Sequence, residues 1–332
     1  MSYWETRQAQ LNRAMNESEQ ALKKRLAAYY DAEEKRLQRQ IASYYANYGK
    51  NNVIEYRQLL QKLPQSDKDL LMRDMESFAK KYPQYEHLLP VRESIYKLNR
   101  LEGLQYSVQV QQLEIGAKSE EEIRKHLEAI SGMSFDSIRK DLGAGSIFNS
   151  ERSDIIRTVV NTHWSKSGNF STALWKDTAR LTKLLNDEIA AGFARGDDYA
   201  KLTRLLRHRF DVGQYEAFRL IYTEGTFVMN ESKARAMADY FEYYSIVTVG
   251  DNRVCHVCED MESQTEAEPV KMSERMAGEN FPPFHPFCRC TYSVVVPDQQ
   301  QWIEEYVMKH GGDPDITEEQ RQQAMEILER FT

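Results

Sequence analysis

The residues of this chain that are best spaced for chemistry are its four cysteines, which all lie within 36 positions of one another. Cys255 and Cys258 form the motif CHVC, while Cys288 and Cys290 lie in HPFCRC, preceded by His285. Two thiolates separated by two residues can hold one side of a tetrahedral zinc ion, and a second Cys or His pair can close the other side. The pattern therefore predicts a metal site that crosslinks two segments, rather than a redox pair.

Six side chains compete for about four coordination positions. His256 is the weakest candidate, because it lies inside CHVC, where the chain direction turns the intervening residues away. One ligand set consists of two i, i+3 pairs, and the other replaces the histidine of the second pair with the last cysteine. The sets are Cys255, Cys258, His285 and Cys288, or the four cysteines, and the residue types leave both open.

We expect this zinc to be structural. A catalytic zinc needs an open coordination position and a neighbouring acid or base. Glu259 and Asp260 are available, but acidic residues are common here, since residues 251–332 contain 17 Asp and Glu against 7 Lys and Arg. This acidic balance repels phosphate, which makes a DNA-reading zinc finger a poor candidate.

Length and composition indicate a folded protein without a membrane span. The 332 residues are 41% hydrophobic and 29% charged, which is enough for a buried core in two or three structural units. No stretch approaches 18 consecutive apolar residues, and the first twenty residues lack the features of a signal peptide. We expect folding in a reducing cytoplasm, where clustered cysteines bind metal more often than they form disulfides.

Apolar residues recur at intervals of three or four over most of the chain, which predicts helices. Gly49 ends the first long helix, Pro83 ends the second and Gly103 interrupts the third. Asp211 and Gly213 are predicted to separate two helices. The expected helices cover residues 17–48, 66–83, 91–115, 119–130, 151–165, 171–194, 198–210 and 214–241, with one or two short helices in 298–332.

Two predicted strands, residues 243–250 and 291–296, bracket the cysteine pairs. The loop from Cys258 to His285 is expected to be irregular, and the glycine-containing stretch 132–149 is expected to be a flexible junction. The predicted fold is therefore mainly α, with a small C-terminal α+β module. Its expected parts are a helical N-terminal arm (1–131), a helical middle section (132–242), the zinc module (243–297) and a short helical tail (298–332).

The first fifty residues carry nine Lys and Arg against six Asp and Glu, interleaved with tyrosines. Such a surface can stack bases and bind phosphate, as in a DNA-binding protein. We favour an amphipathic helix that packs against a partner, because a helix of this length needs a surface to cover its apolar stripe. The basic residues that decide between the two hypotheses are Lys23, Lys24, Arg25, Arg36 and Arg39.

Three segments together point to a known family. They are WSKSGNFSTALWKDTARL at 164–181, FRLIYTEGTFVMNESKA at 218–234, and DNRVCHVCEDM followed by GENFPPFHPFCRC at 278–290. In this order they resemble the minor head protein, or head morphogenesis, family of tailed bacteriophages, the group similar to the F protein of phage Mu. The resemblance covers about residues 150–297, and PPFHPFCRC after DNRVCHVC is its most specific part.

The resemblance implies a structural role. Members of this family associate with the portal vertex, are built into procapsids in a few copies, and are linked to genome packaging or delivery. The family's metal-like positions correspond to Cys255, Cys258, His285 and Cys288 in this chain, with Cys290 also matching.

Further positions match the family around the cysteines. Thr223 and Glu224 match a Thr-Glu pair on the long helix, while Asp251 and Arg253 match the approach to the first cysteine pair. We expect these residues, with Arg289, to be structural. Asp251 is expected to organise its turn. For Glu224 we expect either hydrogen bonds from the backbone around the first cysteine pair, a pair with Arg253 or Arg289, or an ordinary place on the helix surface.

The sequence thus predicts a non-enzymatic minor head protein of the virion, near the portal vertex, that is made in the host cytoplasm. The portal protein is the expected partner. The major capsid or scaffolding protein and phage DNA, through the N-terminal helices, are further candidates, and no membrane partner is expected. Residues 298–332 are too few for a catalytic domain. The alternative is a DNA-binding packaging or ejection factor, and a zinc-dependent hydrolase or nuclease is less favoured.

Overall fold

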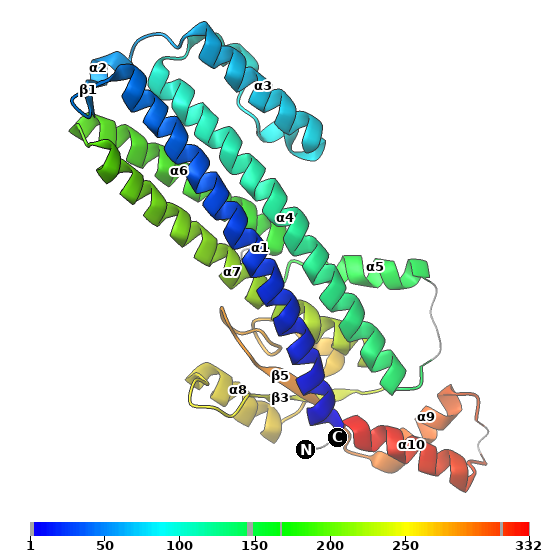
Figure 1. Ribbon diagram of the computed structural model, residues 1–332. Coiled ribbons are helices and arrows are strands. Elements are labelled where there is room, and N and C mark those ends of the chain that lie inside the picture. Colours follow the sequence, from blue (N-terminus) through cyan, green and yellow to red (C-terminus); the bar gives the residue numbers. More distant parts are fainter. Residues whose placement is uncertain (1–2, 145–148, 167, 313–314, 332) are drawn as a thin grey trace. The chain divides into compact units, whose positions relative to one another are not determined.

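The computed structural model describes residues 3–144, 149–166, 168–312 and 315–331. It is mainly helical with a small sheet in the C-terminal part, which confirms the predicted fold class (Figure 1). The helices are α1 (Tyr3–Tyr48), α2 (Tyr56–Leu59), α3 (Gln65–Lys81), η1 (Pro83–Leu88), η2 (Arg92–Lys97), α4 (Arg100–Asp141), α5 (Asn149–Val160), α6 (Phe170–Arg195), α7 (Tyr199–Met237), α8 (His256–Ala267), η3 (Met272–Glu274), α9 (Gln299–Lys309) and α10 (Glu318–Phe331). The strands are β1 (Gly49–Lys50), β2 (Val53–Ile54), β3 (Tyr243–Val247), β4 (Val270–Lys271) and β5 (Thr291–Val295).

Contacts divide the chain into two compact units. We call residues 21–123 and 171–218 the helical unit, and residues 1–20, 124–170 and 219–332 the sheet unit. Helices α1, α4 and α7 contribute residues to both. The units therefore do not follow the order of the chain, and the four parts expected from the sequence stay predictions. Within the described part of the chain, no helix is both long and apolar enough to cross a membrane.

The apolar stripe of α1 is covered by the protein itself. Leu37 and Ile41 are buried in the helical unit, in a cluster with Leu104 of α4, Leu185 of α6 and Leu206 of α7. The tyrosines of α1 belong to this cluster or pack against it, as Tyr29, Tyr30, Tyr44, Tyr45 and Tyr48 do. The expectation that this stripe needs a partner protein was therefore wrong, because the chain's own helices bury it.

Two long helices are continuous where the sequence suggested breaks (Figure 1). α4 joins two predicted helices and continues through Gly132 into the expected junction, of which residues 145–148 lie outside the described residues. α7 passes through Asp211 and Gly213. A Cβ atom on Gly213 would lie 2.6 Å from Leu181 Cδ2 of α6. This glycine therefore permits a close helix contact and does not end a helix, so the predicted separation was wrong.

The sheet of the sheet unit has the order β4-β3-β5, and all its strands are antiparallel. Both strands predicted from the sequence are present as β3 and β5. Tyr244 pairs with Val294 and Ile246 with Tyr292, and all four side chains are buried against the core. Val247, the last residue of β3, pairs with Thr291, the first residue of β5. The segment with the first cysteine pair leaves the sheet at this end, and the segment with the second pair returns to it at the same end.

The last two helices are part of the same core. Trp302 of α9 stacks on Phe241 with ring centroids 5.4 Å apart, and Phe331 of α10 lies 5.3 Å from the same ring. Ile138 and Leu142 of α4 belong to this cluster as well. Residues 299–309 and 318–331 thus form two short helices, in agreement with the prediction of one or two, and they pack into the core of the sheet unit.

Candidate metal centre

The first cysteine pair lies at the start of a helix that the sequence did not predict. Cys255 is the N-cap residue of α8, and Cys258 lies in its first turn, where its amide donates to the Cys255 carbonyl at 3.0 Å. His256 and Val257 between them are exposed, as the geometry of CHVC suggested for the histidine. The expected irregular loop is wrong for residues 258–267, since they belong to this helix.

Helix α8 is held by the free edge of β3. Thr265 Oγ1 accepts a hydrogen bond from the Ile246 amide at 2.8 Å, and Glu262 accepts two from Thr248, from its amide and its hydroxyl, both at 2.8 Å. Strand β4 pairs only with Tyr243 and Tyr244 of β3. The side chains of α8 therefore accept hydrogen bonds from donors farther along this edge, which β4 does not reach. These bonds fix the position of the first cysteine pair relative to the sheet.

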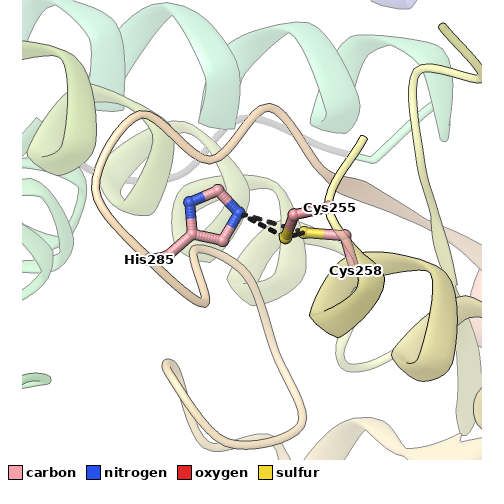
Figure 2. Close-up of side chains that lie close together, drawn as sticks. All are labelled: Cys255, Cys258 and His285. Carbon is pink, nitrogen blue, oxygen red and sulfur yellow. Dashed lines mark hydrogen bonds between the residues drawn. The ribbon is translucent and has the colours of Figure 1, made fainter. Parts of the chain in front are cut away.

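The second segment brings His285 against the first pair. Its Nε2 atom lies 3.3 Å from Cys255 Sγ and 3.2 Å from Cys258 Sγ, and these two sulfurs are 3.6 Å apart (Figure 2). Cys288 Sγ lies 3.9 Å from Cys258 Sγ. All four cysteines are free thiols, and a disulfide would need sulfurs about 2.05 Å apart.

These distances suit a tetrahedral ion. Zinc bound at about 2.3 Å from sulfur and about 2.05 Å from nitrogen places two sulfurs about 3.8 Å apart, and a sulfur and a nitrogen about 3.6 Å apart. The observed sulfur separations, 3.6 and 3.9 Å, bracket the first value, and the sulfur–nitrogen separations are 0.3 to 0.4 Å shorter than the second. Cys255, Cys258 and His285 are therefore placed to hold one ion together, and Cys288 lies beside Cys258 at the separation expected for a further ligand.

The tautomer of His285 supports its role as a ligand. Its Nδ1 atom lies 2.8 Å from the Pro286 carbonyl oxygen, which can only accept, so Nδ1 carries the proton. In the neutral ring Nε2 is then unprotonated, and Figure 2 shows this nitrogen turned toward the sulfurs of Cys255 and Cys258. A histidine whose other nitrogen donates to a backbone carbonyl is the usual arrangement in protein metal sites.

Cys290 belongs to a second group that shares Cys258. The sulfurs of Cys258, Cys288 and Cys290 lie within 4.8 Å of one another, and all three residues are buried. Hydrogen bonding with Cys290 lowers the pKa of Cys288 to about 5, and it raises the pKa of Cys290. Burial raises the pKa of Cys258 to about 12. The structure thus brings together all five predicted ligands, with Cys290 on the side of Cys258 and Cys288.

The five residues can hold a metal ion. Among the described residues, neither group of ligand atoms includes a carboxylate. Glu259 and Asp260, the candidate acids, are exposed on α8. Thiolate and imidazole are the ligands that zinc prefers in closed structural sites.

Asp251 organises the approach to the first cysteine pair. Its carboxylate accepts two hydrogen bonds from Arg289, at 2.6 and 2.7 Å, and one from the Arg253 amide at 3.0 Å. The Arg253 guanidinium also bonds to it at 3.0 Å. The hydrogen bond from Arg289 is the main cause that lowers the pKa of Asp251. Because Arg289 lies between Cys288 and Cys290, this pair links the two cysteine-containing segments.

Glu224 has a different partner from those expected. Its carboxylate accepts a hydrogen bond from the indole nitrogen of Trp164 at 3.0 Å, and Trp164 stacks on Phe227 with centroids 5.1 Å apart. Both arginines expected as its partners bind Asp251 instead. Burial raises the pKa of Glu224 from its ordinary 4.5 to about 7. Glu224 therefore attaches the loop after α5 to α7.

Thr223, the neighbour of Glu224, does face the segment that contains His285 and Cys288. Its Oγ1 atom donates to the Arg219 carbonyl at 2.8 Å and accepts from the Phe287 amide at 3.2 Å. Phe287 lies between His285 and Cys288, so this side chain of α7 contacts the turn that carries two candidate ligands.

Two further residues of α7 continue this contact, and the sequence analysis missed both. Asn230 donates to the Cys290 carbonyl at 3.1 Å and accepts from the Thr291 hydroxyl at 2.9 Å, and Lys233 donates to the same hydroxyl at 2.9 Å. Both side chains are fully buried. Their spacing from Thr223, seven and ten residues, places all three on one face of α7, and this buried polar face was the available signal.

The family comparison covers this site. Residues 183–293 match the family model described as Phage Mu protein F like protein. The resemblance to the phage Mu F-like family is confirmed. The Mu F-like segment begins within α6, includes all of α7 and α8, and ends within β5. It therefore contains all five candidate ligands and the polar face of α7, and it supports a phage head morphogenesis protein. No curated protein and no solved structure matches the chain.

Proposed function

We propose that this chain is a structural minor head protein of a tailed bacteriophage, associated with the portal vertex of the virion head and acting in head assembly and in genome packaging or delivery. The observation that carries the proposal is the position of the family match, since it spans the segment that contains the metal centre. Assembly would take place in the host cytoplasm. The portal protein is the proposed partner, and the major capsid or scaffolding protein is a further candidate.

The metal centre has a structural role in this proposal. Cys255, Cys258, His285 and Cys288 would hold one zinc ion, and Cys290 is the alternative fourth ligand to His285. Four protein ligands fill a tetrahedral zinc, so no position stays open for substrate or water. Three of the cysteines are buried, and Glu259 and Asp260 are exposed on α8. Two further acids of this segment have other partners, since Glu262 binds Thr248 and Asp251 binds two arginines. These features favour a crosslink over a hydrolase or nuclease.

The proposed portal association rests on the family, not on the first helix, because the stripe of α1 is already buried. A DNA-binding role has less support from the structure. Arg25 pairs with Glu122 at 3.2 Å, and Arg36 lies 3.1 Å from Glu114, so two of the five decisive basic residues are neutralised by the chain itself. The tyrosines beside them pack in the core and are not free to stack on bases.

Purified procapsids and virions test the proposal. Mass spectrometry should detect this chain in both at a few copies per particle, and the portal protein should copurify with it at moderate salt. Absence from both kinds of particle would overturn the proposal. DNA binding that weakens with salt and disappears when Lys23, Lys24, Arg25, Arg36 and Arg39 are neutralised would favour the DNA-binding alternative instead.

A further inference from the structure

We propose that Thr223 is a positioning residue for the metal centre: its hydroxyl fixes the turn His285–Cys288 so that the imidazole and the Cys288 sulfur converge on the first cysteine pair. This role depends on the metal centre proposed above, but Thr223 itself is not a ligand. Its hydroxyl contacts the backbone of the turn and none of the candidate ligand atoms.

The turn that carries the two ligands has an unfavourable backbone. The Cys288 amide donates to the His285 carbonyl at 3.1 Å, which closes a four-residue turn with Pro286 at its second position. The third position is Phe287, with a φ of +59°. Turns of this kind take glycine or asparagine at the third position, because a bulky side chain is disfavoured in the left-handed region. Pro286 suits the second position of such a turn, but Phe287 does not suit the third, so this residue needs contacts from outside the turn.

Contacts from α7 hold the turn in place. The Phe287 amide points out of the turn and donates to Thr223 Oγ1 at 3.2 Å, while the Phe287 ring packs against Tyr222 with centroids 5.6 Å apart. Strained backbone persists only where surrounding structure fixes it. Of these contacts, the hydrogen bond fixes the orientation of the peptide between Pro286 and Phe287, which ring packing alone leaves free to rotate.

The orientation of that peptide determines where both ligands point. The ligand residues stand on either side of it, so a rotation of the peptide moves the His285 ring and the Cys288 sulfur in different directions. The bond from His285 Nδ1 to the Pro286 carbonyl would change as well, since that oxygen belongs to the same peptide. Thr223 thus acts on the metal through its hydrogen bond from the Phe287 amide. The same peptide supplies the Pro286 carbonyl, to which the proposed ligand His285 is bonded. Outer partners of this kind typically contribute 10- to 100-fold to metal affinity.

Helix α7 offers a matched control. Thr226 is one turn further along, is buried and, like Thr223, donates its hydroxyl to the carbonyl four residues before it, at 3.1 Å. Among the hydrogen bonds of the described residues, Thr226 has none to the segment that contains His285 and Cys288. A Thr-to-Val change at either position removes the bond to the helix carbonyl, but only the change at Thr223 removes the bond to Phe287.

The experiment uses full-length protein, stripped of metal with a chelator under reducing conditions and reloaded with Co²⁺ or Zn²⁺. Co²⁺ in a tetrahedral thiolate site gives visible ligand-field bands, and competition with a chromophoric chelator gives the affinity. Thr223→Val should lower the affinity for both ions 10- to 100-fold and alter the Co²⁺ spectrum. Thr223→Ser, which keeps the hydroxyl, and Thr226→Val should both stay within about threefold of the wild type.

The outcomes separate this role from the metal centre. Circular dichroism of the metal-free variants checks that Thr223→Val and Thr226→Val fold alike. If the wild type binds metal, and Thr223→Val binds it equally tightly with the same Co²⁺ spectrum, the positioning role alone is overturned. Equal losses in Thr223→Val and Thr226→Val would also overturn it, because the effect would then come from the helix. Wild-type protein that takes up no metal would overturn the metal centre and this role together.

Discussion

Replacing Glu224 with glutamine should make the protein more stable at neutral and alkaline pH. The carboxyl group is buried and accepts a hydrogen bond from the indole nitrogen of Trp164. The side-chain oxygen of a glutamine can accept the same hydrogen bond. Burial raises its pKa from 4.5 to about 7 in the folded protein. The native state therefore keeps a proton that the unfolded chain releases between these values, so stability falls as pH rises through this window.

The magnitude follows from the two pKa values. At 1.36 kcal/mol for each pKa unit, the difference corresponds to about 3 kcal/mol, of which about 2.5 kcal/mol develops between pH 5 and pH 8. Below pH 4.5 both states are protonated and the cost disappears. Above pH 7 the cost is complete and constant. Glu224→Gln carries no charge at any pH, so its advantage over the wild type should grow by this amount across the window.

Urea unfolding at pH 5, 6, 7 and 8, with chelator present so that both proteins are metal-free, measures the difference in the free energy of unfolding. Comparison at equal pH cancels every other titrating group. Glu259→Gln is the control, since Glu259 is an exposed carboxylate on α8 and its variant should follow the wild-type curve. A difference between Glu224→Gln and wild type that stays constant within about 0.5 kcal/mol from pH 5 to pH 8 would refute the reasoning.

Two more predictions concern the same unit. Phe331→Ala should destabilise the protein by about 3–5 kcal/mol in urea unfolding, because it removes a buried ring from the core. Met325→Ala, on the exposed side of α10, is the control and should change the free energy of unfolding by less than about 1 kcal/mol. Equal effects would show that α10 does not belong to the core. Burial lowers the pKa of Lys233 from 10.5 to about 7, so stability should rise with pH between these values, the opposite sign to Glu224. Lys233→Met should abolish that rise in unfolding measured from pH 7 to pH 10, and an unchanged slope would contradict the assignment.

The sequence identified the candidate ligands because their chemistry is local. Two cysteines separated by two residues form a chelating pair wherever they lie, and strands of β-branched and aromatic residues on either side indicated that the chain returns. Spacing could not choose between His285 and Cys290. That question turns on the bond between His285 Nδ1 and a carbonyl, which depends on how the turn folds.

Other features depend on contacts between distant residues, which spacing does not encode. Helix α8 has few apolar residues, so its sequence shows no apolar stripe that would predict a helix. Its buried residues are Cys258 and Thr265, and they are buried only because the helix packs beside the sheet. Gly213 looks like a helix end in sequence and is a close contact in the fold, because the missing Cβ makes room for Leu181. Likewise, nothing near Glu224 in the sequence indicates that its partner is Trp164, sixty residues earlier.

Native mass spectrometry of the full-length protein, purified under reducing conditions without chelator, tests the metal centre most directly. We expect one zinc ion per chain, with a mass that corresponds to the displacement of protons by the ion, and loss of that ion in Cys258→Ser, whose sulfur belongs to both ligand groups. A metal-free chain at its plain sequence mass, or one lighter by the two hydrogens of a disulfide, would contradict the metal centre.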